Sequence, residues 1–426
     1  MLNILCHNFS DSFLSYALSN SQQPNMIKIG VIREGKIPAD NRVPLNPQQA
    51  KYMSDMGVDI VVQPSAIRCF SDKDYKDLGI RLQEDLSDRD VILGVKEVPI
   101  EDLLSGKTYF FFSHTIKEQA YNQPLLKHIV DNQIKLIDYE VLTDENGSRV
   151  IAFGKFAGMV GAHNALWTYG QRTKEYDLPR MKDLFDYKAA TQVYDKIKFP
   201  KLKIVLTGTG RVAGGAAMVL EDMGIKKVSP LDYLSNDFDY PVYTQLNSFF
   251  YTTRKDGEIF NSAQDFYDNP TEYISDFSHF LPMTDIMING IYWNNDAPAF
   301  FTLDEMKSDK FGIKVISDVT CDIAPVSSIP CTIKASTIED PVFGFDPRTG
   351  TETTPHGAAV VDMMTIDNLP NELPRDASTS FGDMFINNVL NELGNRRSEI
   401  IQRATIAEYG NLGKNFEYLR DYLNGK

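Results

Sequence analysis

The sequence predicts an α/β protein with two domains, each built on a parallel sheet. Short apolar runs alternate with helical segments from residue 26 to about 138, and a second alternating series begins at Lys203. Strands that alternate with helices imply a parallel sheet with helical cover. Because ligands bind outside the carboxyl ends of strands in open α/β sheets, functional residues are expected where the apolar runs end.

The first series contains five apolar runs and two helical segments. The strands are expected at 27–32, 58–63, 91–95, 109–112 and 135–138. Helices are expected at 47–56, closed by Gly57 as a C-cap, and at 118–132. A stretch rich in small residues, 157–162, predicts a long helix that packs closely on a neighbour and crosses between the domains.

The second series has strands expected at 204–207, 227–229, 286–289 and 314–318. Between the second and third strands, residues 235–284 form an insertion crowded with Phe and Tyr, which predicts a packed subdomain because long structureless loops are uncommon. After Pro355, the segments 378–393 and 396–423 have the spacing of amphipathic helices.

Composition excludes several classes of protein. The 426 residues carry a net charge of −15, which argues against nucleic acid or an anionic membrane as a partner. No apolar run approaches the ~20 residues that span a bilayer. The four cysteines fit no zinc pattern, which predicts thiols in a reducing, cytoplasmic compartment and no metal site. Residues 1–25 lack Lys and Arg, unlike a signal peptide, and are expected to be a disordered extension.

A glycine pattern follows the strand expected at 204–207. Gly208, Gly210 and Ala213 match G-x-G-x-x-G/A, in which the first glycine makes the turn and the second lets a pyrophosphate approach the helix N-terminus. Asp232 lies about 20 residues further on, where a carboxylate would bind the adenosine ribose and favour NAD over NADP. Alternatively, Asp232 is a helix N-cap or a turn residue.

Two titratable side chains follow neighbouring apolar runs of the first domain. Lys96 comes after 91–95, and His114 comes after 109–112. A desolvated Lys and a His can exchange protons near neutral pH, so the two predict an acid–base pair. The alternatives are a solvated surface Lys and a structural His. Four further cations lie near turns and strand ends: Arg33, Arg42, Lys117 and Arg149. Together they would suit a substrate with several carboxylates. Alternatively, they are solvated surface charges. Glu140 could bind a substrate ammonium or be a salt-bridged loop carboxylate.

Several of these segments resemble one family. Gly94–Lys96, Phe112–Lys117, Ile137–Glu140, Ala152–Gly154, Ile288–Trp293, Ser336–Glu339 and Ile366–Pro370 are similar to the saccharopine-forming enzymes of lysine metabolism. The nearest resemblance is to the lysine–2-oxoglutarate reductase half of aminoadipic semialdehyde synthase, and the fungal-type saccharopine dehydrogenase (L-lysine-forming) is more distant. Both belong with alanine dehydrogenase in a wider superfamily of two Rossmann-like domains with parallel sheets and an interdomain cleft.

The resemblance implies a reaction and the residues that carry it. The lysine ε-amine condenses with 2-oxoglutarate, and a nicotinamide hydride reduces the imine to saccharopine; the reverse reaction releases lysine. The family's acid–base residues fall on Lys96 and His114. Its substrate-binding residues fall on Arg42, Lys117, Glu140, Arg149 and Phe153, with Arg33 nearby, and its cofactor positions fall on Gly210, Arg211, Asp232, Val319 and Asp367. The reductase halves commonly use NADPH, whereas Asp232 favours NAD with NADP possible.

The expected organisation follows from this assignment. The catalytic domain is expected at 26–160 with 356–426, and the dinucleotide-binding domain at 161–355 with the aromatic insertion 235–284. The chain lacks the second dehydrogenase domain of the bifunctional enzyme, so one activity is expected. Two rivals remain: an alanine dehydrogenase-like enzyme acting on a small amino acid, and a non-catalytic binding or regulatory protein that retains the fold.

Overall fold

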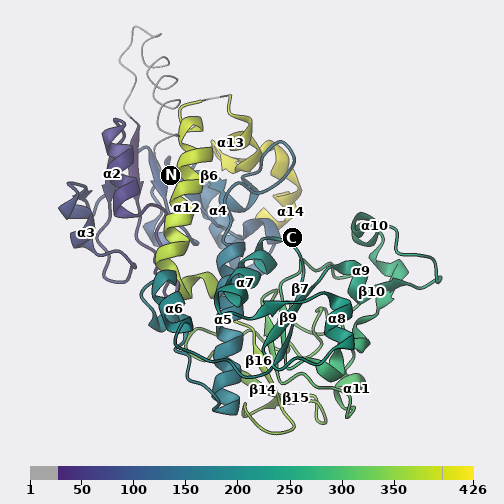
Figure 1. Ribbon diagram of the computed structural model, residues 1–426. Helices are drawn as coiled ribbons and strands as arrows, with labels where there is room; N and C mark the ends of the chain where they lie inside the picture. The colour runs from purple at the N-terminus through teal and green to yellow at the C-terminus, as the bar shows by residue number, and fades with distance from the viewer. Residues whose placement is uncertain (1–26, 396) are drawn as a thin grey trace. The chain divides into compact units, whose positions relative to one another are not determined.

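The computed structural model describes residues 27–395 and 397–426, so the extension expected at 1–25 lies outside the described residues. The chain forms two compact units (Figure 1). The first comprises residues up to Ala152 together with Pro374–Lys426, and the second comprises Phe153–Leu373. The sequence predicts changes of domain at 160/161 and 355/356, whereas the chain passes between the units at 152/153 and 373/374.

The first unit is built on a mainly parallel sheet whose described strands run in the order β18-β17-β6-β5-β4-β1-β2-β3. Strands β1 to β6 are parallel to one another, and β17 and β18 add to the β6 edge in antiparallel orientation. The strands are Lys28–Val31 (β1), Asp59–Val62 (β2), Arg81–Leu82 (β3), Val91–Leu93 (β4), Thr108–Phe111 (β5), Lys135–Asp138 (β6), Thr405–Glu408 (β17) and Asn411–Leu412 (β18). The helices are Pro47–Asp55 (α2), Asp72–Asp77 (α3), Gln123–Asp131 (α4), Pro374–Asn388 (α12), Glu399–Ala404 (α13) and Arg420–Leu423 (α14).

The strand order of the first unit determines where a ligand can bind. The chain fills one side of β1 with β2 and β3, then crosses to the other side with β4, β5 and β6. Ligands of open α/β sheets bind at such a reversal, outside the carboxyl ends of the strands. Here the reversal lies between β1 and β4, so the segments that follow these two strands form the expected site.

The C-terminal return of the chain is held to the first unit by specific contacts. Helix α2 begins with a capping box in which Asn46 and Gln49 bond reciprocally. The Gln49 side chain also donates to the Thr379 carbonyl and to Asp383 of α12, both at 2.7 Å. A Cβ at Gly382 would lie 2.1 Å from Gln49 Oε1, so the absence of a side chain there lets α12 approach α2. These contacts explain why α12 belongs with the first unit.

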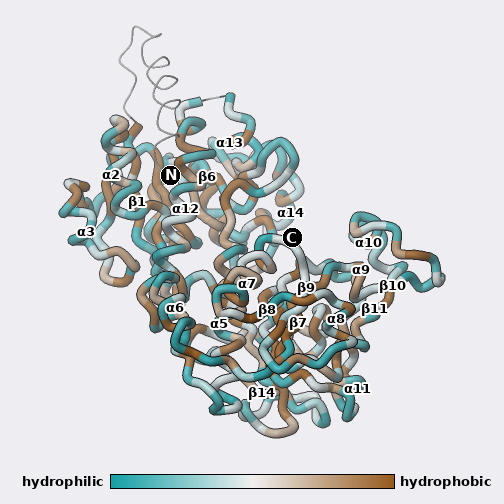
Figure 2. The backbone as a smooth tube through the Cα atoms, viewed as in Figure 1, coloured by the Kyte–Doolittle hydropathy of each residue, from teal (hydrophilic) through white to brown (hydrophobic). Residues whose placement is uncertain are grey.

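The second unit has its own sheet, with described strands in the order β15-β14-β16-β13-β12-β7-β9-β8. Strands β8, β9, β7, β12, β13 and β16 are parallel, and β14 and β15 are antiparallel additions. Hydrophobic residues, brown in Figure 2, line the strands. The strands are Lys203–Thr207 (β7), Lys226–Lys227 (β8), Val242–Leu246 (β9), Thr252–Arg254 (β10), Tyr273–Ser275 (β11), Ile286–Asn289 (β12), Val315–Asp318 (β13), Phe343–Asp346 (β14), Thr351–Thr353 (β15) and Val361–Met364 (β16). The helices are Gly154–Thr173 (α5), Tyr187–Tyr194 (α6), Arg211–Asp222 (α7), Pro230–Ser235 (α8), Ser248–Tyr251 (α9), Ala263–Asp268 (α10) and Leu303–Met306 (α11).

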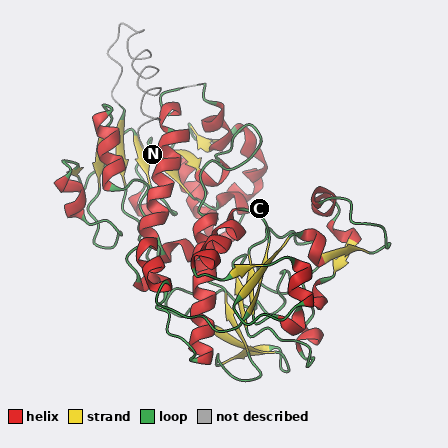
Figure 3. Cartoon of the chain, viewed as in Figure 1, coloured by secondary structure: helices red, strands yellow, loops and turns green. Residues whose placement is uncertain are grey.

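The α/β fold class and the alternating strands are confirmed, but three predictions are wrong. The segment 396–423 is not helical throughout, because β17 and β18 interrupt it and extend the sheet. The segment 118–132 is helical only at α4 and in single turns before it. The aromatic insertion is not a separate subdomain. Its strand β9 lies in the main sheet beside β7, and its aromatic side chains share one core with Phe300 and Phe301, leaving only β10 and β11 as a small sheet of their own (Figure 3).

Candidate active site

Lys96 lies just past the carboxyl end of β4, beside the reversal of strand order. Its backbone N–H donates to Glu34 Oε2 at 2.8 Å, and the preceding N–H of Val95 donates to Glu34 Oε1 at 2.7 Å. Burial lowers the pKa of the Lys96 ammonium, and the positive charges of Arg42 and Lys36 lower it further. A lysine that releases its proton more readily than a solvated one suits general base catalysis.

His114 lies beyond the end of β5 and is joined to the residue after Lys96. Its Nδ1 lies 2.5 Å from Glu97 Oε1, and Lys36 Nζ donates to Glu97 Oε2 at 2.8 Å. Burial alone would raise the pKa of Glu97, but the hydrogen bonds and charges of His114 and Lys36 outweigh burial and lower it to about 2. The Glu97 anion therefore holds Nδ1 as a donor and leaves Nε2 to exchange a proton with a substrate.

The backbone of His114 is also unusual. Its φ is 54°, in the left-handed region that residues other than glycine seldom occupy. Such a conformation costs about 1–3 kcal/mol and occurs preferentially at functional sites. The bond to Glu97 and the burial of Ser113 and Thr115 on either side hold the ring in place.

Asp138, at the end of β6, joins the ends of β5 and β6. It accepts hydrogen bonds from the Ser113 backbone N–H at 2.9 Å, the Ser113 hydroxyl at 2.5 Å and the Glu140 backbone N–H at 2.7 Å. Burial raises the pKa of Asp138, and these donors oppose the rise. Asp138 therefore orders the two loops that carry His114 and Glu140.

Glu140 gathers two of the predicted substrate cations. Arg149 donates to its Oε1 at 2.8 Å, and Lys117 Nζ lies 3.8 Å from the same oxygen. Glu140 is buried, whereas both cations are about half exposed. Within the described residues, Glu140 Oε2 and the neighbouring Tyr139 hydroxyl are buried without a hydrogen-bond partner. Polar atoms left in this state are expected to meet a ligand or water.

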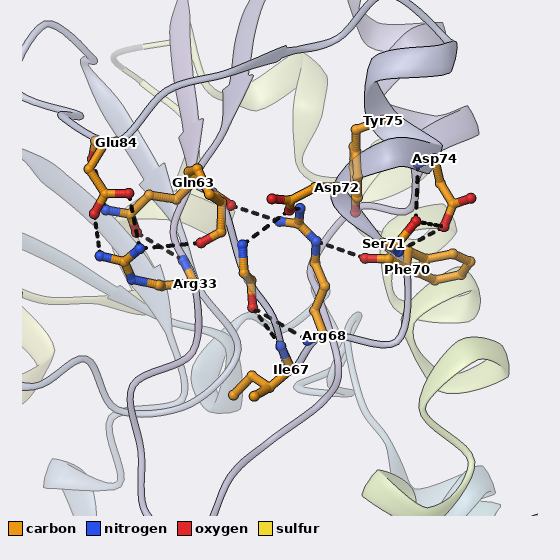
Figure 4. Close-up of polar contacts among 12 residues, drawn as sticks. Arg33, Gln63, Ile67, Arg68, Phe70, Ser71, Asp72, Asp74, Tyr75 and Glu84 are labelled. Atoms are coloured by element: carbon orange, nitrogen blue, oxygen red, sulfur yellow. Dashed lines mark hydrogen bonds and ion pairs between the residues drawn. The ribbon is translucent and has the colours of Figure 1, made fainter.

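Two predicted cations are engaged elsewhere. Arg42 is 2% exposed, and its Nε and NH2 groups bond both oxygens of the buried Asp40, at 2.9 and 2.5 Å. Arg33 follows β1 but turns toward the β2–β3 side, where it bonds Glu84 and the Pro64 carbonyl (Figure 4). The structure thus brings Lys117, Glu140 and Arg149 into one cluster and keeps Arg33 out of it.

The glycine turn of the second unit has the form that a dinucleotide requires. Gly208 has φ +96°, and a Cβ there would lie 2.6 Å from the Gly290 carbonyl oxygen. Gly210 is the N-cap of α7, and a Cβ there would meet no heavy atom within 4 Å among the described residues. Arg211 is the first residue of α7, and Ala213 is fully buried. The turn therefore leaves open space for a phosphate at the N-terminus of a helix of three turns.

Helices α5 and α7 of this unit touch through their glycines. A Cβ at Gly158 would lie 1.8 Å from the Val212 carbonyl oxygen, and one at Gly215 would lie 2.0 Å from the Lys155 carbonyl oxygen. The backbones approach too closely for any side chain to fit between them. The predicted close packing of the small-residue helix is confirmed.

Asp232 lies beyond the edge of the second sheet. It follows the edge strand β8, which β9 separates from β7, and it lies in the first turn of α8. Its Oδ2 accepts from the hydroxyl of the α8 N-cap, Ser229, at 2.6 Å. The alternative that Asp232 is itself a helix N-cap is therefore wrong, because Ser229 holds that position, and ribose binding by Asp232 stays a prediction.

Three further predicted residues belong to the second unit. Phe153 is the N-cap residue of α5. Val319 follows β13 and packs on α5, since a Cβ at Gly161 would lie 2.6 Å from Val319 Cγ2. Asp367 follows Ile366, which pairs with Ser336 in an isolated parallel bridge. Val319 thus lies at the carboxyl edge of the sheet that also carries the glycine turn.

Sequence reasoning missed two groups of polar residues. One is the set Glu34, Lys36, Asp40, Glu97 and Asp138, which supports the predicted side chains of the first unit. The only local signal for it is the adjacency of Glu97 to Lys96. The other is a fully buried network at the ends of β7, β12 and β13: Asn289 bonds Thr207 at 2.7 Å and Asp318 at 2.9 Å.

Two kinds of feature are absent from the described residues. No group of three or more His, Cys, Asp or Glu side chains within them could hold a metal ion. Among them, no helix has both the length and the apolar character that crossing a membrane requires.

Comparison with known proteins adds a family to this geometry. Residues 30–160 match the family model of the alanine dehydrogenase/PNT N-terminal domain. The bovine (Bos taurus) mitochondrial alpha-aminoadipic semialdehyde synthase is 32% identical over 432 residues, covering 89% of this chain and 46% of that protein. A Yarrowia lipolytica saccharopine dehydrogenase [NAD(+), L-lysine-forming] is 27% identical, covering 85% of this chain and 92% of that protein. The chain is thus similar to the saccharopine dehydrogenases (L-lysine-forming) and to the aminoadipic semialdehyde synthases.

The predicted resemblance to these enzymes is thereby confirmed, as is the similarity to the alanine dehydrogenases. Among solved structures, an L-alanine dehydrogenase covers 93% of this chain with a TM-score of 0.63 and 15% identity, which shows the shared fold alone. The chain spans about half the length of the aminoadipic semialdehyde synthases that it matches.

Proposed function

We propose that this protein is a nicotinamide-dependent oxidoreductase that interconverts saccharopine with L-lysine and 2-oxoglutarate. The observation that carries the proposal is the arrangement of Lys96, Glu97 and His114. A desolvated lysine follows β4, at the reversal of strand order, and a histidine with one nitrogen fixed follows the neighbouring strand β5. The names of the bovine and Yarrowia relatives support this substrate class.

The proposed roles follow from the environment of each residue. Lys96 accepts and returns a proton as the amine adds to the keto carbon and water leaves, because its pKa is lowered by burial. His114 exchanges protons through Nε2 while Nδ1 stays bonded to the Glu97 anion. Lys117 and Arg149 bind substrate carboxylates, and the partnerless Glu140 Oε2 accepts from a substrate ammonium. Arg33, Arg42 and Phe153 remain proposed substrate contacts.

The cofactor proposal rests on the second unit. NAD, when bound, supplies or accepts the hydride, and the chain holds its pyrophosphate at Gly208, Gly210 and Arg211 on the N-terminus of α7. Ala213, Asp232, Val319 and Asp367 complete the proposed cofactor set, with NADP as the possible alternative. The Yarrowia relative is named for NAD(+).

The wider setting of the enzyme is also a proposal. Its partners are small molecules and not nucleic acid, because the net charge is −15. We place it in the cytoplasm on the basis of its few, scattered cysteines. The bovine relative is named as mitochondrial, so imaging of a tagged chain beside a mitochondrial marker decides between the two compartments.

The test is oxidation of NADH and NADPH in the presence of 2-oxoglutarate, with and without lysine. We expect lysine-dependent oxidation that Lys96→Met and His114→Ala each abolish. Lys73→Met is the matched control, because Lys73 is exposed and pairs only with Asp77 on α3 among the described residues. Turnover with pyruvate and ammonia in place of lysine and 2-oxoglutarate would favour the alanine dehydrogenase-like rival. Failure to bind either coenzyme would favour a non-catalytic protein.

A further inference from the structure

Glu34 is a buried carboxyl group at the reversal of strand order, and neither the sequence analysis nor the proposed mechanism uses it. It follows β1 and is 9% exposed. Both of its oxygens are engaged by backbone rather than by side-chain cations: Oε1 accepts from Val95 N–H at 2.7 Å, and Oε2 from Lys96 N–H at 2.8 Å. The carboxyl thus crosses from the end of β1 to the end of β4.

The surroundings of Glu34 disfavour its charged form, so the ionised carboxylate would lower the stability of the folded chain. Burial raises its pKa, and the nearby Asp40 carboxylate raises it further, to about 8. Arg42 opposes this effect, but its guanidinium bonds both oxygens of Asp40. The Tyr139 hydroxyl, whose pKa burial and the Glu34 charge both raise, is buried without a hydrogen-bond partner among the described residues.

Replacing a buried ionisable group with an apolar side chain of similar volume is often neutral or stabilising. The carboxyl group of Glu34 at this buried position therefore indicates a role other than stability. The contacts themselves indicate the reason. The Lys96 loop lacks regular structure after Leu93, and Glu34 binds two successive N–H groups of that loop. Gly94 lies against Glu34 and Ile32, since a Cβ there would lie 3.6 Å from Glu34 Oε1 and 3.2 Å from Ile32 Cγ2.

We propose that Glu34 is a positioning residue for Lys96, holding the backbone that carries the ammonium at the carboxyl edge of the sheet. Glu34 acts through the loop, by two backbone hydrogen bonds, and is not itself a proton donor to the substrate. The proposal rests on the proposed function only for the claim that the position of Lys96 affects turnover.

The test compares Glu34→Gln with Glu34→Asp and with the matched control Glu101→Gln, whose side chain is exposed on the same loop. Glutamine can accept from one of the two N–H groups but turns an NH2 group toward the other. Aspartate keeps the acid but is shorter by one methylene. Because a displacement of about 1 Å near the chemistry can cost about 100-fold, we expect kcat to fall at least about 10-fold in Glu34→Gln, less in Glu34→Asp, and not in Glu101→Gln.

Two readouts distinguish positioning from a general loss of folding. Titration of NADH fluorescence should give dissociation constants within about twofold of the unmodified chain, because the glycine turn belongs to the other unit. Reductive methylation with carbon-13 formaldehyde should give an NMR resonance for Lys96, which is identified by its absence in Lys96→Met. In Glu34→Gln this resonance should titrate at higher pH, because the released loop is better solvated.

The resonance needs no substrate, so it separates the two proposals. If the unmodified chain shows no lysine-dependent oxidation but the Lys96 titration shifts, the proposed function fails and the role of Glu34 stands. An unchanged titration together with kcat within twofold in Glu34→Gln overturns the role of Glu34. If Glu34→Gln does not fold, the same two results in Glu34→Asp decide.

Discussion

Replacing Glu97 with Gln removes the anion that joins His114 to Lys36 while keeping the size of the side chain. In the structure, Glu97 Oε1 lies 2.5 Å from His114 Nδ1, and Oε2 accepts from Lys36 at 2.8 Å. The amide keeps one acceptor and loses the charge. The His114 ring should then lose the charge-assisted bond that fixes Nδ1 as the donor.

The magnitude follows from the pKa of Glu97. Its fall from 4.5 to about 2, in a side chain only 11% exposed, corresponds to about 3 kcal/mol of stabilisation of the anion, shared between His114 and Lys36. If His114 provides about half, the loss of its share corresponds to about 10-fold. We expect kcat/KM near neutral pH to fall by about 10-fold to 100-fold, because the ring also loses the contact that orients it.

The assay is the pH dependence of kcat/KM for lysine-dependent NADH oxidation. The fall should be present across the pH range, and Lys36→Met should cause a smaller one because the His114 bond remains. Glu101→Gln, exposed on the same loop, serves as the control for loss of one negative charge. A kcat/KM within twofold of the unmodified chain at every pH would refute the reasoning that Glu97 orients His114.

Three further predictions concern the fold and the coenzyme. Because the pKa of Glu34 is raised from 4.5 to about 8 in the folded chain, the free energy of unfolding should fall as pH rises from 4.5 to 8. Urea unfolding at several pH values should show a flatter slope for Glu34→Gln. Parallel slopes for the two proteins would contradict this prediction. Gly158→Ala places a Cβ 1.8 Å from the Val212 carbonyl oxygen and should lower the free energy of unfolding by about 3 kcal/mol, with Gly214→Ala, in open space, as the control; equal stability would mean that α5 and α7 separate without cost. Asp232→Ala should weaken NADH binding by about tenfold and leave NADPH binding within about twofold, as expected for a carboxylate that binds the adenosine ribose; an unchanged NADH dissociation constant would assign Asp232 to helix α8 alone.

The alternation of apolar runs with helices was sufficient to predict the fold class. Strands such as Ile286–Asn289 are buried along their whole length, so they appear in the sequence as continuous apolar runs between turn residues. The same logic fails for short or edge strands. Asn411–Leu412 is a strand of two residues whose only pairing is with β17, and no local pattern distinguishes it from one turn of an amphipathic helix.

The order of strands could not be read from the sequence either. The sequence places β8 next along the chain after α7, but β9, formed within the aromatic segment, takes the place beside β7. Which strands pair depends on contacts between residues far apart in the sequence, namely on how their buried faces pack. The order of the strands along the chain does not determine this pairing. Chain order alone therefore did not show that β9 separates the strand before Asp232 from the strand before the glycine turn.

The candidate site shows the same division. The sequence by itself determined which residues end the apolar runs, and hence that Lys96, His114 and Glu140 share one edge of a parallel sheet. Only the tertiary structure decided their partners: Glu34 at the Lys96 loop, Glu97 on His114, and Arg33 turned away to Glu84. The local geometry of a strand is sufficient to place a side chain at the edge of a sheet. Hydrogen bonds and ion pairs between loops instead join residues far apart in the sequence, so no local pattern predicts them.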